Sequence, residues 1–312
     1  MPSQSRRTAR STQSATAASS GRSGQRDWSN GDRQDRLSAQ PTTELRDNPL
    51  PWAPQNRSVQ YQSAPGSDLF RDGASAGDVV QGRNGSRYLG DCWLLASLAA
   101  LAQTQPTVLE QAITAHDDGS YTVRLYGEDA AGVLSAEDVR VAGTIPMTAN
   151  GQDAYAQRED PGELWVVVIE KAFAAWKGGY GGLHAGLPSH ALTALTGRAA
   201  SDTATAHKTD ASLGETFRNN ADAQRAMVAA SRPNLNLDAG GIIPGHAHTI
   251  LGVEGTGDRA MVTLRDPYAE YEPQGHGARD GVFTLTMAEF REQFDYFSTA
   301  GDAEAENRDL LW

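Results

Sequence analysis

The sequence predicts an α+β protein in which a helical half precedes a β-rich half, and three features support this. Residues 1–60 are rich in Ser, Thr, Arg, Gln and Pro and have few aliphatic clusters. A dense run of helix formers follows Cys92, and alternating hydrophobic and polar residues dominate the chain after Gly197. In chain order, these patterns are typical of a disordered tail, of helices and of strands.

Composition restricts the classes of function open to the chain. The 312 residues carry a net charge of −12, so we expect the folded part not to bind nucleic acid. The single cysteine excludes an internal disulfide. No run approaches the roughly 20 apolar residues of a membrane span, and the start has no apolar signal segment. We therefore expect a protein that is cytoplasmic, or exported without a Sec signal peptide.

The first half is predicted to contain helices around one hairpin. Cys92 opens a run of helix formers after a Gly-Asp turn, and a large apolar residue recurs every three or four positions from Trp165 to Trp176. A Pro-Ser start and Gly197 bound a further helix. The expected elements are helices at 92–102, 108–113, 163–177 and 188–195 and paired strands at 121–127 and 138–143.

The second half is predicted to be mostly strand. An amphipathic helix is expected over 212–231, and a capping box at Thr286–Glu289 predicts a last helix. Alternation of apolar and polar residues predicts strands at 246–253, 259–265 and 281–285.

Cys92 is the residue around which the chemistry is expected. At a helix start, the dipole and unpaired backbone N–H groups favour the thiolate and lower a thiol pKa from about 8.5 to roughly 3.5–7.5. The alternative is a small buried apolar residue, which most free cysteines are.

A thiolate nucleophile needs a proton acceptor and a group that orients the acceptor. His246 begins one predicted strand, and Asp266 ends the next. If these strands pair in antiparallel fashion, Asp266 accepts from one imidazole nitrogen while the other faces Cys92. Taken alone, a His on a strand is more often structural, and an Asp-Pro pair is more often a turn.

Seven motifs occur in order between residues 70 and 297. They are Val80-Gln81-Gly82, Leu89-Gly90-Asp91-Cys92-Trp93-Leu94-Leu95-Ala96, Glu163-Leu164-Trp165 with Glu170-Lys171-Ala172-Phe173-Ala174, Gly178-Gly179-Tyr180, Gly245-His246-Ala247-His248-Thr249, Leu264-Arg265-Asp266-Pro267-Tyr268, and Asp280-Gly281-Val282-Phe283 with Glu289-Phe290. With these motifs, the sequence resembles the calpain family of papain-like cysteine proteases, particularly bacterial calpain-like proteins. The resemblance implies a two-lobed papain-like calpain protease core with the active site between a helical lobe and a β-rich lobe.

The resemblance implies that Cys92 is the nucleophile and His246 the general base. His248 stands where the family usually has Tyr and is the second choice of base. Asp266 stands where calpains have Asn, and Tyr268 replaces a Trp that shields the pair from water. A carboxylate orients an imidazole as an amide does, so a Cys-His-Asp triad is chemically sound.

The oxyanion donor implied by the resemblance is Gln81, together with the Cys92 backbone N–H. Here five extra residues, 83–87, follow Gln81-Gly82. Gln81 is favoured because its upstream spacing matches the family. The alternatives are Asn84, Ser86 or a lost donor.

Two further sets of residues follow from the resemblance. Asp78 and Glu163 match acidic ligands of a calcium site in the first lobe, although both are equally expected to be solvated or paired with arginines. Gly182 and Gly186 are implied to lie near the cleft wall, where a substrate backbone approaches. No cofactor is required for the chemistry, and Ca²⁺ is the one ion implied.

The implied function is a monomeric endopeptidase that hydrolyses proteins or peptides through a thioester acyl-enzyme. One alternative is transglutaminase or deamidase acyl transfer on glutamine, and another is an inactive calpain-like binding module. The expected organisation is a disordered tail (1–60), a helical lobe (61–198), a β-rich lobe (199–300) and an acidic C-terminal tail (301–312).

Overall fold

A computed structural model describes residues 44–46, 48–52, 59–82, 89–158, 162–236, 241–273 and 278–301. The chain divides into two units, Met1–Thr42 and Thr43–Trp312, and the elements below belong to the second. Most of the predicted N-terminal tail, the 83–87 insertion and nearly all of the predicted C-terminal tail lie outside the described residues.

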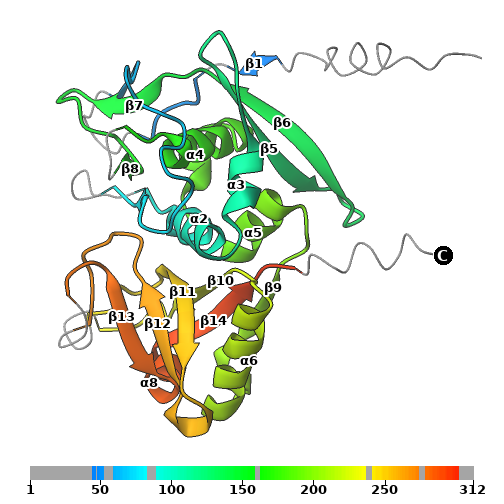
Figure 1. Cartoon of the computed structure of the whole chain (residues 1–312), viewed down its shortest axis with the longest axis vertical. Helices are drawn as coiled ribbons and strands as arrows, with labels where there is room; N and C mark the ends of the chain where they lie inside the picture. The colour runs from blue at the N-terminus through cyan, green and yellow to red at the C-terminus, as the bar shows by residue number, and fades with distance from the viewer. Residues whose placement is uncertain are drawn as a thin grey trace, which may run out of the picture. The chain divides into compact units, whose positions relative to one another are not determined.

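The helices of the first lobe form its core. Every residue of α2 from Trp93 to Ala102 is buried, as is α4 from Trp165 to Ala174. Figure 1 shows these helices beside a long hairpin, whose strands pack on α4 and α5. The helices are α2 (Cys92–Thr104), α3 (Pro106–Ala112), α4 (Trp165–Trp176), η1 (Tyr180–Leu183) and α5 (Pro188–Thr196).

The first lobe contains more strand than the sequence predicted. A four-stranded sheet has the order β1-β6-β5-β4, and two small sheets pair β2 with β7 and β3 with β8. The strands are β1 (Leu45–Arg46), β2 (Val59–Gln62), β3 (Val79–Val80), β4 (Ile113–Ala115), β5 (Tyr121–Glu128), β6 (Leu134–Val141), β7 (Ile145–Thr148) and β8 (Gln157–Arg158).

Part of the segment predicted as a tail contacts the first lobe. β1 pairs in parallel with β6, and the Tyr180 backbone N–H donates to the Leu50 carbonyl over 2.9 Å. The Trp52 ring stacks on the His184 ring with centroids 5.2 Å apart. Residues 44–52, where described, therefore add to the helical lobe.

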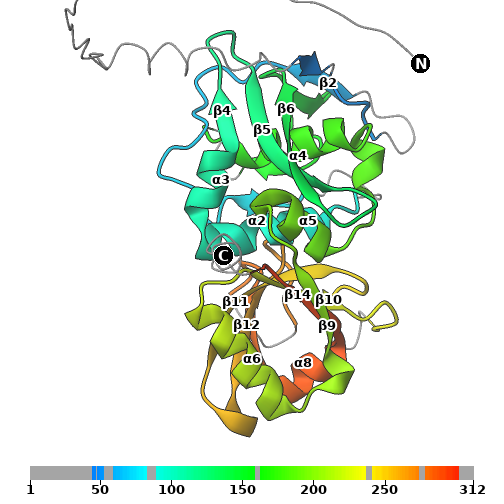
Figure 2. The same ribbon diagram turned by 90° about the vertical axis from the view of Figure 1, so that its right-hand side faces the viewer.

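The second lobe is built on a six-stranded sheet of order β13-β12-β11-β10-β14-β9. Figure 2 shows the sheet curving, with α6 and α8 along it, and both helices contribute to its hydrophobic core. Its elements are β9 (Ser201–Ala204), η2 (Thr205–His207), α6 (Asp210–Asp222), β10 (Met227–Ser231), β11 (Ala247–Glu254), η3 (Gly257–Arg259), β12 (Met261–Arg265), β13 (Val282–Thr286), α8 (Met287–Gln293) and β14 (Phe294–Thr299).

The structure confirms the predicted α+β fold and corrects the predicted helix over 212–231. α6 ends at Asp222, and residues 227–231 form β10 between β11 and β14. Met227 and Ala229 face the core of the β-rich lobe, whereas Val228 faces that of the helical lobe. A strand buried on both faces reads as a continuous apolar run, which resembles a buried helix.

The two lobes meet where α2 packs against β11 and β10. The Thr249 hydroxyl of β11 donates to the Ala96 carbonyl of α2 over 2.8 Å. Ala247, two residues earlier in β11, packs into the core of the helical lobe. These contacts hold the start of α2 beside the start of β11. Within the described ranges, none of the helices combines the length and apolar character needed to cross a membrane.

Candidate active site

Cys92 is the first residue of α2, as the sequence predicts. The preceding Asp91 carbonyl accepts the first helical hydrogen bonds, from the backbone N–H groups of Leu94 and Leu95. The backbone N–H groups of Ala247 and Trp93 lie near enough to the Cys92 sulfur to lower the pKa of its thiol. Ala247 directly follows His246, so the thiol meets the strand that carries the proposed base.

The resting thiol does not have the lowered pKa that its helical position predicts. Burial raises the pKa of Cys92 to about 12, and the negative charges of Asp91 and Asp266 add to this effect. The prediction of a lowered pKa is wrong because burial of the sulfur and the two nearby carboxylates raise the pKa by more than the helix dipole lowers it. Cys92 is therefore a neutral thiol in this arrangement.

We expect alkylation of Cys92 by iodoacetamide to be slow at pH 7 and to rise about tenfold per pH unit towards pH 9, because only the thiolate reacts. The rate is measured between pH 5 and pH 9, and the single cysteine makes the signal unambiguous. The unfolded protein in urea is the control, since its thiol has an ordinary pKa. A fast rate that is constant from pH 5 to pH 8 would contradict a neutral resting thiol.

His246 is held by backbone and ring contacts at the entrance to β11. Its backbone N–H donates to the Ser231 hydroxyl over 2.9 Å, and that hydroxyl donates to the His246 carbonyl over 3.1 Å. The ring lies parallel to the Tyr268 ring, with centroids 4.9 Å apart and planes at 2°. Tyr268 thus covers the imidazole on one side, in the place predicted for a shielding residue.

Asp266 brings His246 and His248 together. Its Oδ1 lies 3.3 Å from His246 Nε2 and accepts from the Tyr268 backbone N–H over 2.7 Å. Its Oδ2 lies 3.3 Å from His248 Nε2. Burial alone raises the pKa of Asp266, but hydrogen bonds from His246 and then His248 lower it well below its usual range. Asp266 is therefore an anion between two imidazoles.

The contact between His248 and Asp266 was not predicted from the sequence. Residues 246 and 248 are two apart at the start of a strand, so their side chains point to the same face. Both rings are buried, and their centroids lie 5.1 Å apart in an edge-to-face arrangement. The strand period was the available signal.

Gln81 contacts Asp91, the residue before Cys92, and the hydrogens of its side-chain amide are already donated to other acceptors. Its Nε2 donates to the Leu89 carbonyl and to Asp91 Oδ1, each over 2.9 Å. Two acceptors at one atom fix the orientation of this amide. Donation to an oxyanion requires one of these two hydrogen bonds to open. Asn84 and Ser86, the alternative donors, lie outside the described residues.

Asp78 and Glu163 lie close enough for the charge of Asp78 to affect Glu163. Burial raises the pKa of Glu163, and Asp78 contributes to the rise. Asp78 accepts from the Ser75 backbone N–H and hydroxyl and from Trp165 Nε1 over 2.7–3.0 Å. Ca²⁺ takes six to eight oxygen ligands. The described residues contain no group of three or more potential metal ligands, and the calcium site at Asp78 and Glu163 stays a prediction.

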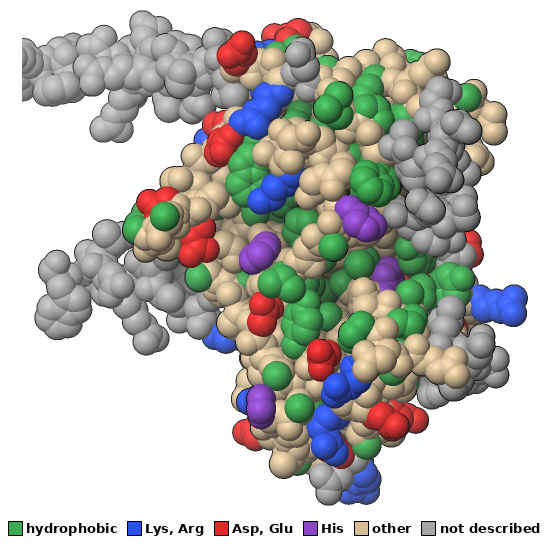
Figure 3. Space-filling model, turned by 180° about the vertical axis from the view of Figure 1, so that it is seen from behind, with side chains coloured by type: hydrophobic (Ala, Val, Ile, Leu, Met, Phe, Trp, Pro, Cys, Tyr) green, Lys and Arg blue, Asp and Glu red, His purple; other side chains and the backbone are tan. Residues whose placement is uncertain are grey.

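Gly182 and Gly186 line one pocket of about 380 Å³ in the helical lobe, together with the rings of Trp93, Phe173 and Trp176. A Cβ on Gly186 would lie 2.4 Å from the Trp93 ring, so internal packing also requires this glycine. On the face drawn in Figure 3, hydrophobic and His side chains gather across the middle. The pocket combines these aromatic walls with polar side chains, among them Glu128, Lys177 and His190.

The comparisons with known proteins agree with this fold. Residues 35–281 match the family described as calpain family cysteine protease. Calpain-type cysteine protease DEK1 of Zea mays is 32% identical over 213 residues, which cover 64% of this chain and 9% of that protein. Calpain-8 of Homo sapiens is 25% identical over 292 residues, which cover 78% of this chain and 38% of the human protein.

A second plant relative, calpain-type cysteine protease ADL1 of Oryza sativa subsp. japonica, is 32% identical over 225 residues, which cover 68% of this chain and 10% of that protein. The chain thus spans only 9% and 10% of the lengths of the maize and rice proteins. The bacterial origin suggested by the sequence stays a prediction. The match over residues 35–281 shows that the chain belongs to the calpain family of cysteine proteases.

Proposed function

We propose that the protein is a cysteine endopeptidase that hydrolyses peptide bonds in protein or peptide substrates with a Cys92-His246-Asp266 triad. The observation that carries the proposal is the meeting of the two lobes at Cys92. Its sulfur lies beside the Ala247 backbone N–H, which lowers the pKa of the thiol, and the neighbouring His246 ring contacts buried Asp266 over 3.3 Å. These groups are a nucleophile, a base and an orienting carboxylate, which is the set that acyl transfer needs.

In the proposed reaction, the Cys92 thiol gives its proton to His246 as the sulfur attacks the scissile carbonyl carbon. Proton transfer accompanies attack because burial keeps the resting thiol protonated. The C–N bond then breaks, and His246 gives the proton to the leaving amine. A thioester remains on Cys92. Water, deprotonated by His246, attacks the thioester, and the proton returns to the sulfur as the acid product leaves.

Asp266 and Tyr268 support His246 in this scheme. The Asp266 carboxylate faces His246 Nε2, so it fixes the ring and stabilises the imidazolium that forms. The stacked Tyr268 ring limits the access of water to that contact. No step requires a metal ion.

The oxyanion is expected to be held by the Cys92 backbone N–H and by Gln81. The first N–H groups of a helix have no acceptor within the helix, so Cys92 N–H is available for this purpose. Gln81 joins it when its hydrogen bond to Leu89 or Asp91 opens. Loss of one such donor costs about 10²–10³ in kcat.

The experiment that tests this function compares the wild type with Cys92→Ala on an unstructured protein substrate. We expect new peptide N-termini with the wild type, detected by mass spectrometry, and none with the variant. Ammonia release and a mass change at glutamine without backbone cleavage would instead indicate deamidase or transglutaminase chemistry. Binding without any product would indicate an inactive module.

A further inference from the structure

Behind Cys92, the structure places two carboxyl groups against each other inside the helical lobe. Asp91 and Glu170 are each 1% exposed, and their carboxyl groups lie close enough for each to shift the pKa of the other. Asp91 precedes α2, and Glu170 lies in the middle of α4. Among the described residues, no cation forms an ion pair with either. Buried acids without a cation are rare, so this pair needs an explanation.

The groups around the pair are donors or neutral rings. Gln81 Nε2 donates to Asp91 Oδ1 over 2.9 Å, and the Ala156 backbone N–H donates to Glu170 Oε1 over 3.0 Å. The buried Tyr180 ring of η1 and the Tyr61 ring of β2 also face Glu170. The adjacent Lys171 points elsewhere, because its Nζ donates to the carbonyls of Ala142 and Thr144 over 2.8 and 2.6 Å.

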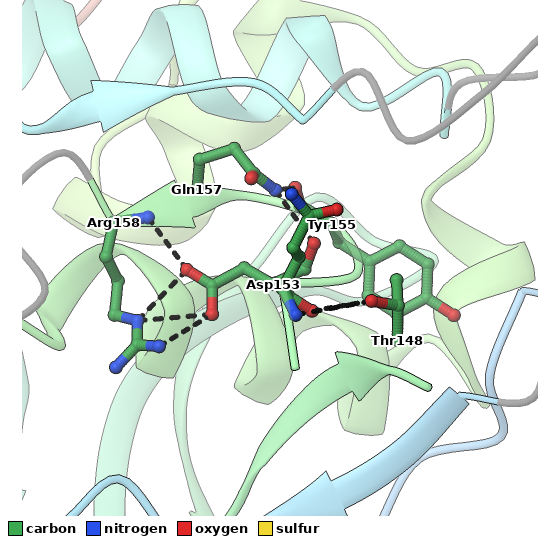
Figure 4. Close-up of polar contacts among 6 residues, drawn as sticks. Thr148, Asp153, Tyr155, Gln157 and Arg158 are labelled. Atoms are coloured by element: carbon green, nitrogen blue, oxygen red, sulfur yellow. Dashed lines mark hydrogen bonds and ion pairs between the residues drawn. The ribbon is translucent and has the colours of Figure 1, made fainter. Parts of the chain in front are cut away.

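A third acid, Asp153, lies near enough to raise the pKa of Glu170, and Arg158 neutralises its charge. Asp153 lies in the loop between β7 and β8 and forms a 2.8 Å ion pair with Arg158 (Figure 4). From the start of β8, Gln157 Nε2 donates back to the Asp153 and Tyr155 carbonyls over 3.0 and 2.8 Å. These contacts pin the segment whose Ala156 N–H reaches Glu170.

The pair is expected to hold one proton. Asp91 Oδ2 and Glu170 Oε2 are buried, and no amide, hydroxyl or charged N–H group of the described residues donates to either, as expected for two oxygens that share a proton. Two touching carboxylates cannot both ionise in a buried site. Burial and the Asp91 charge raise the pKa of Glu170 well above its usual range, whereas burial raises that of Asp91 to about 6. Near neutral pH the proton therefore lies on Glu170.

We propose that Glu170 is a positioning residue, which as a neutral acid donates to Asp91 and so fixes the carboxylate that holds the Gln81 amide beside the start of the Cys92 helix. Hydrogen bonds run from Ala156 to Glu170 and from Gln81 to Asp91, and the proposed bond from Glu170 to Asp91 joins the two. The same loop also packs on the residue after Gln81, since a Cβ on Gly82 would lie 1.8 Å from the Tyr155 carbonyl oxygen.

The first test compares Glu170→Gln with Glu170→Met, and its activity readout rests on the proposed function. A glutamine retains both contacts, because its carbonyl accepts from Ala156 and its amide donates to Asp91. We expect Glu170→Gln to keep kcat within about threefold and Glu170→Met to lower kcat by about 10²-fold at nearly unchanged KM, the size of effect seen when an oxyanion donor is misplaced.

Lys171→Met is the matched control on the same helix. It removes a neighbouring buried charge that faces away from the pair, so we expect altered stability with kcat unchanged. A Glu170→Met protein with wild-type kcat would overturn the positioning role. A Glu170→Gln protein as impaired as Glu170→Met would also overturn the positioning role, because glutamine retains both hydrogen bonds and should preserve kcat.

The second test is independent of turnover and follows the shared proton by thermal unfolding. A carboxyl whose pKa is raised in the folded state stabilises the fold below its unfolded pKa, and this contribution is lost as pH rises towards the folded value. We therefore expect the melting temperature of Glu170→Gln to exceed that of the wild type at pH 7.5, with the gap closing towards pH 4.5. A difference in melting temperature that does not depend on pH would contradict a proton shared by Asp91 and Glu170. A wild type that cleaves no substrate would instead refute the proposed function and leave this second test intact.

Discussion

Replacing His246 with Gln is expected to lower kcat by about 10³-fold, whereas the same change at His248 lowers it by less than about tenfold. His246 is the base in the proposed reaction, since it adjoins Ala247, whose N–H contacts the Cys92 sulfur. His248 contacts the far oxygen of Asp266, and its ring packs between Phe283 and Phe294. It is therefore expected to orient Asp266 without exchanging a proton with substrate.

The measurement is the pair of kcat and KM values for each variant on one peptide substrate, with thermal unfolding to show that both proteins are folded. His248→Gln is the matched control, because it removes an equally buried imidazole from the same carboxylate. The opposite ranking, with His248→Gln inactive and His246→Gln active, would move the base to His248.

Local patterns predicted the elements around the site, because each is specified by its own residues. The helix that begins at Cys92 and the capping box at Thr286 and Glu289 are both present. Pairing of β11 with β12 was also predicted, and it brings Thr249 opposite Arg265, so that Asp266 lies beside the start of β11. Period, caps and strand order were sufficient for these features.

Features that depend on packing between distant segments were not predictable in the same way. The pKa of Cys92 is raised because the lobes close around the sulfur, which a helix start alone does not reveal. The Asp91–Glu170 contact joins two helices that are far apart in the sequence, and each residue alone looks like a surface acid. β10 was misread because its two faces enter two different cores. In each case the deciding contact is tertiary.

Asp266 is the residue for which two substitutions are expected to separate orientation from charge. Asp266→Asn retains an oxygen that accepts from the Tyr268 N–H and faces His246, so we expect kcat to fall by only about tenfold through loss of the charge. Asp266→Ala removes both contacts and leaves two buried imidazoles without their acceptor. We expect it to lower kcat by about 10⁴-fold.

The pH dependence of stability tests the same residue without a substrate. The pKa of Asp266 is lowered in the folded protein, so its contribution to stability is present above its unfolded pKa of about 3.9 and is lost as pH falls towards the folded value. Asp266→Asn is therefore expected to unfold at a lower temperature than the wild type at pH 7, with the gap closing below pH 4. If the variant matched the wild type at every pH, Asp266 would not be ionised between the two imidazoles, and the carboxylate of the proposed triad would have to be sought elsewhere.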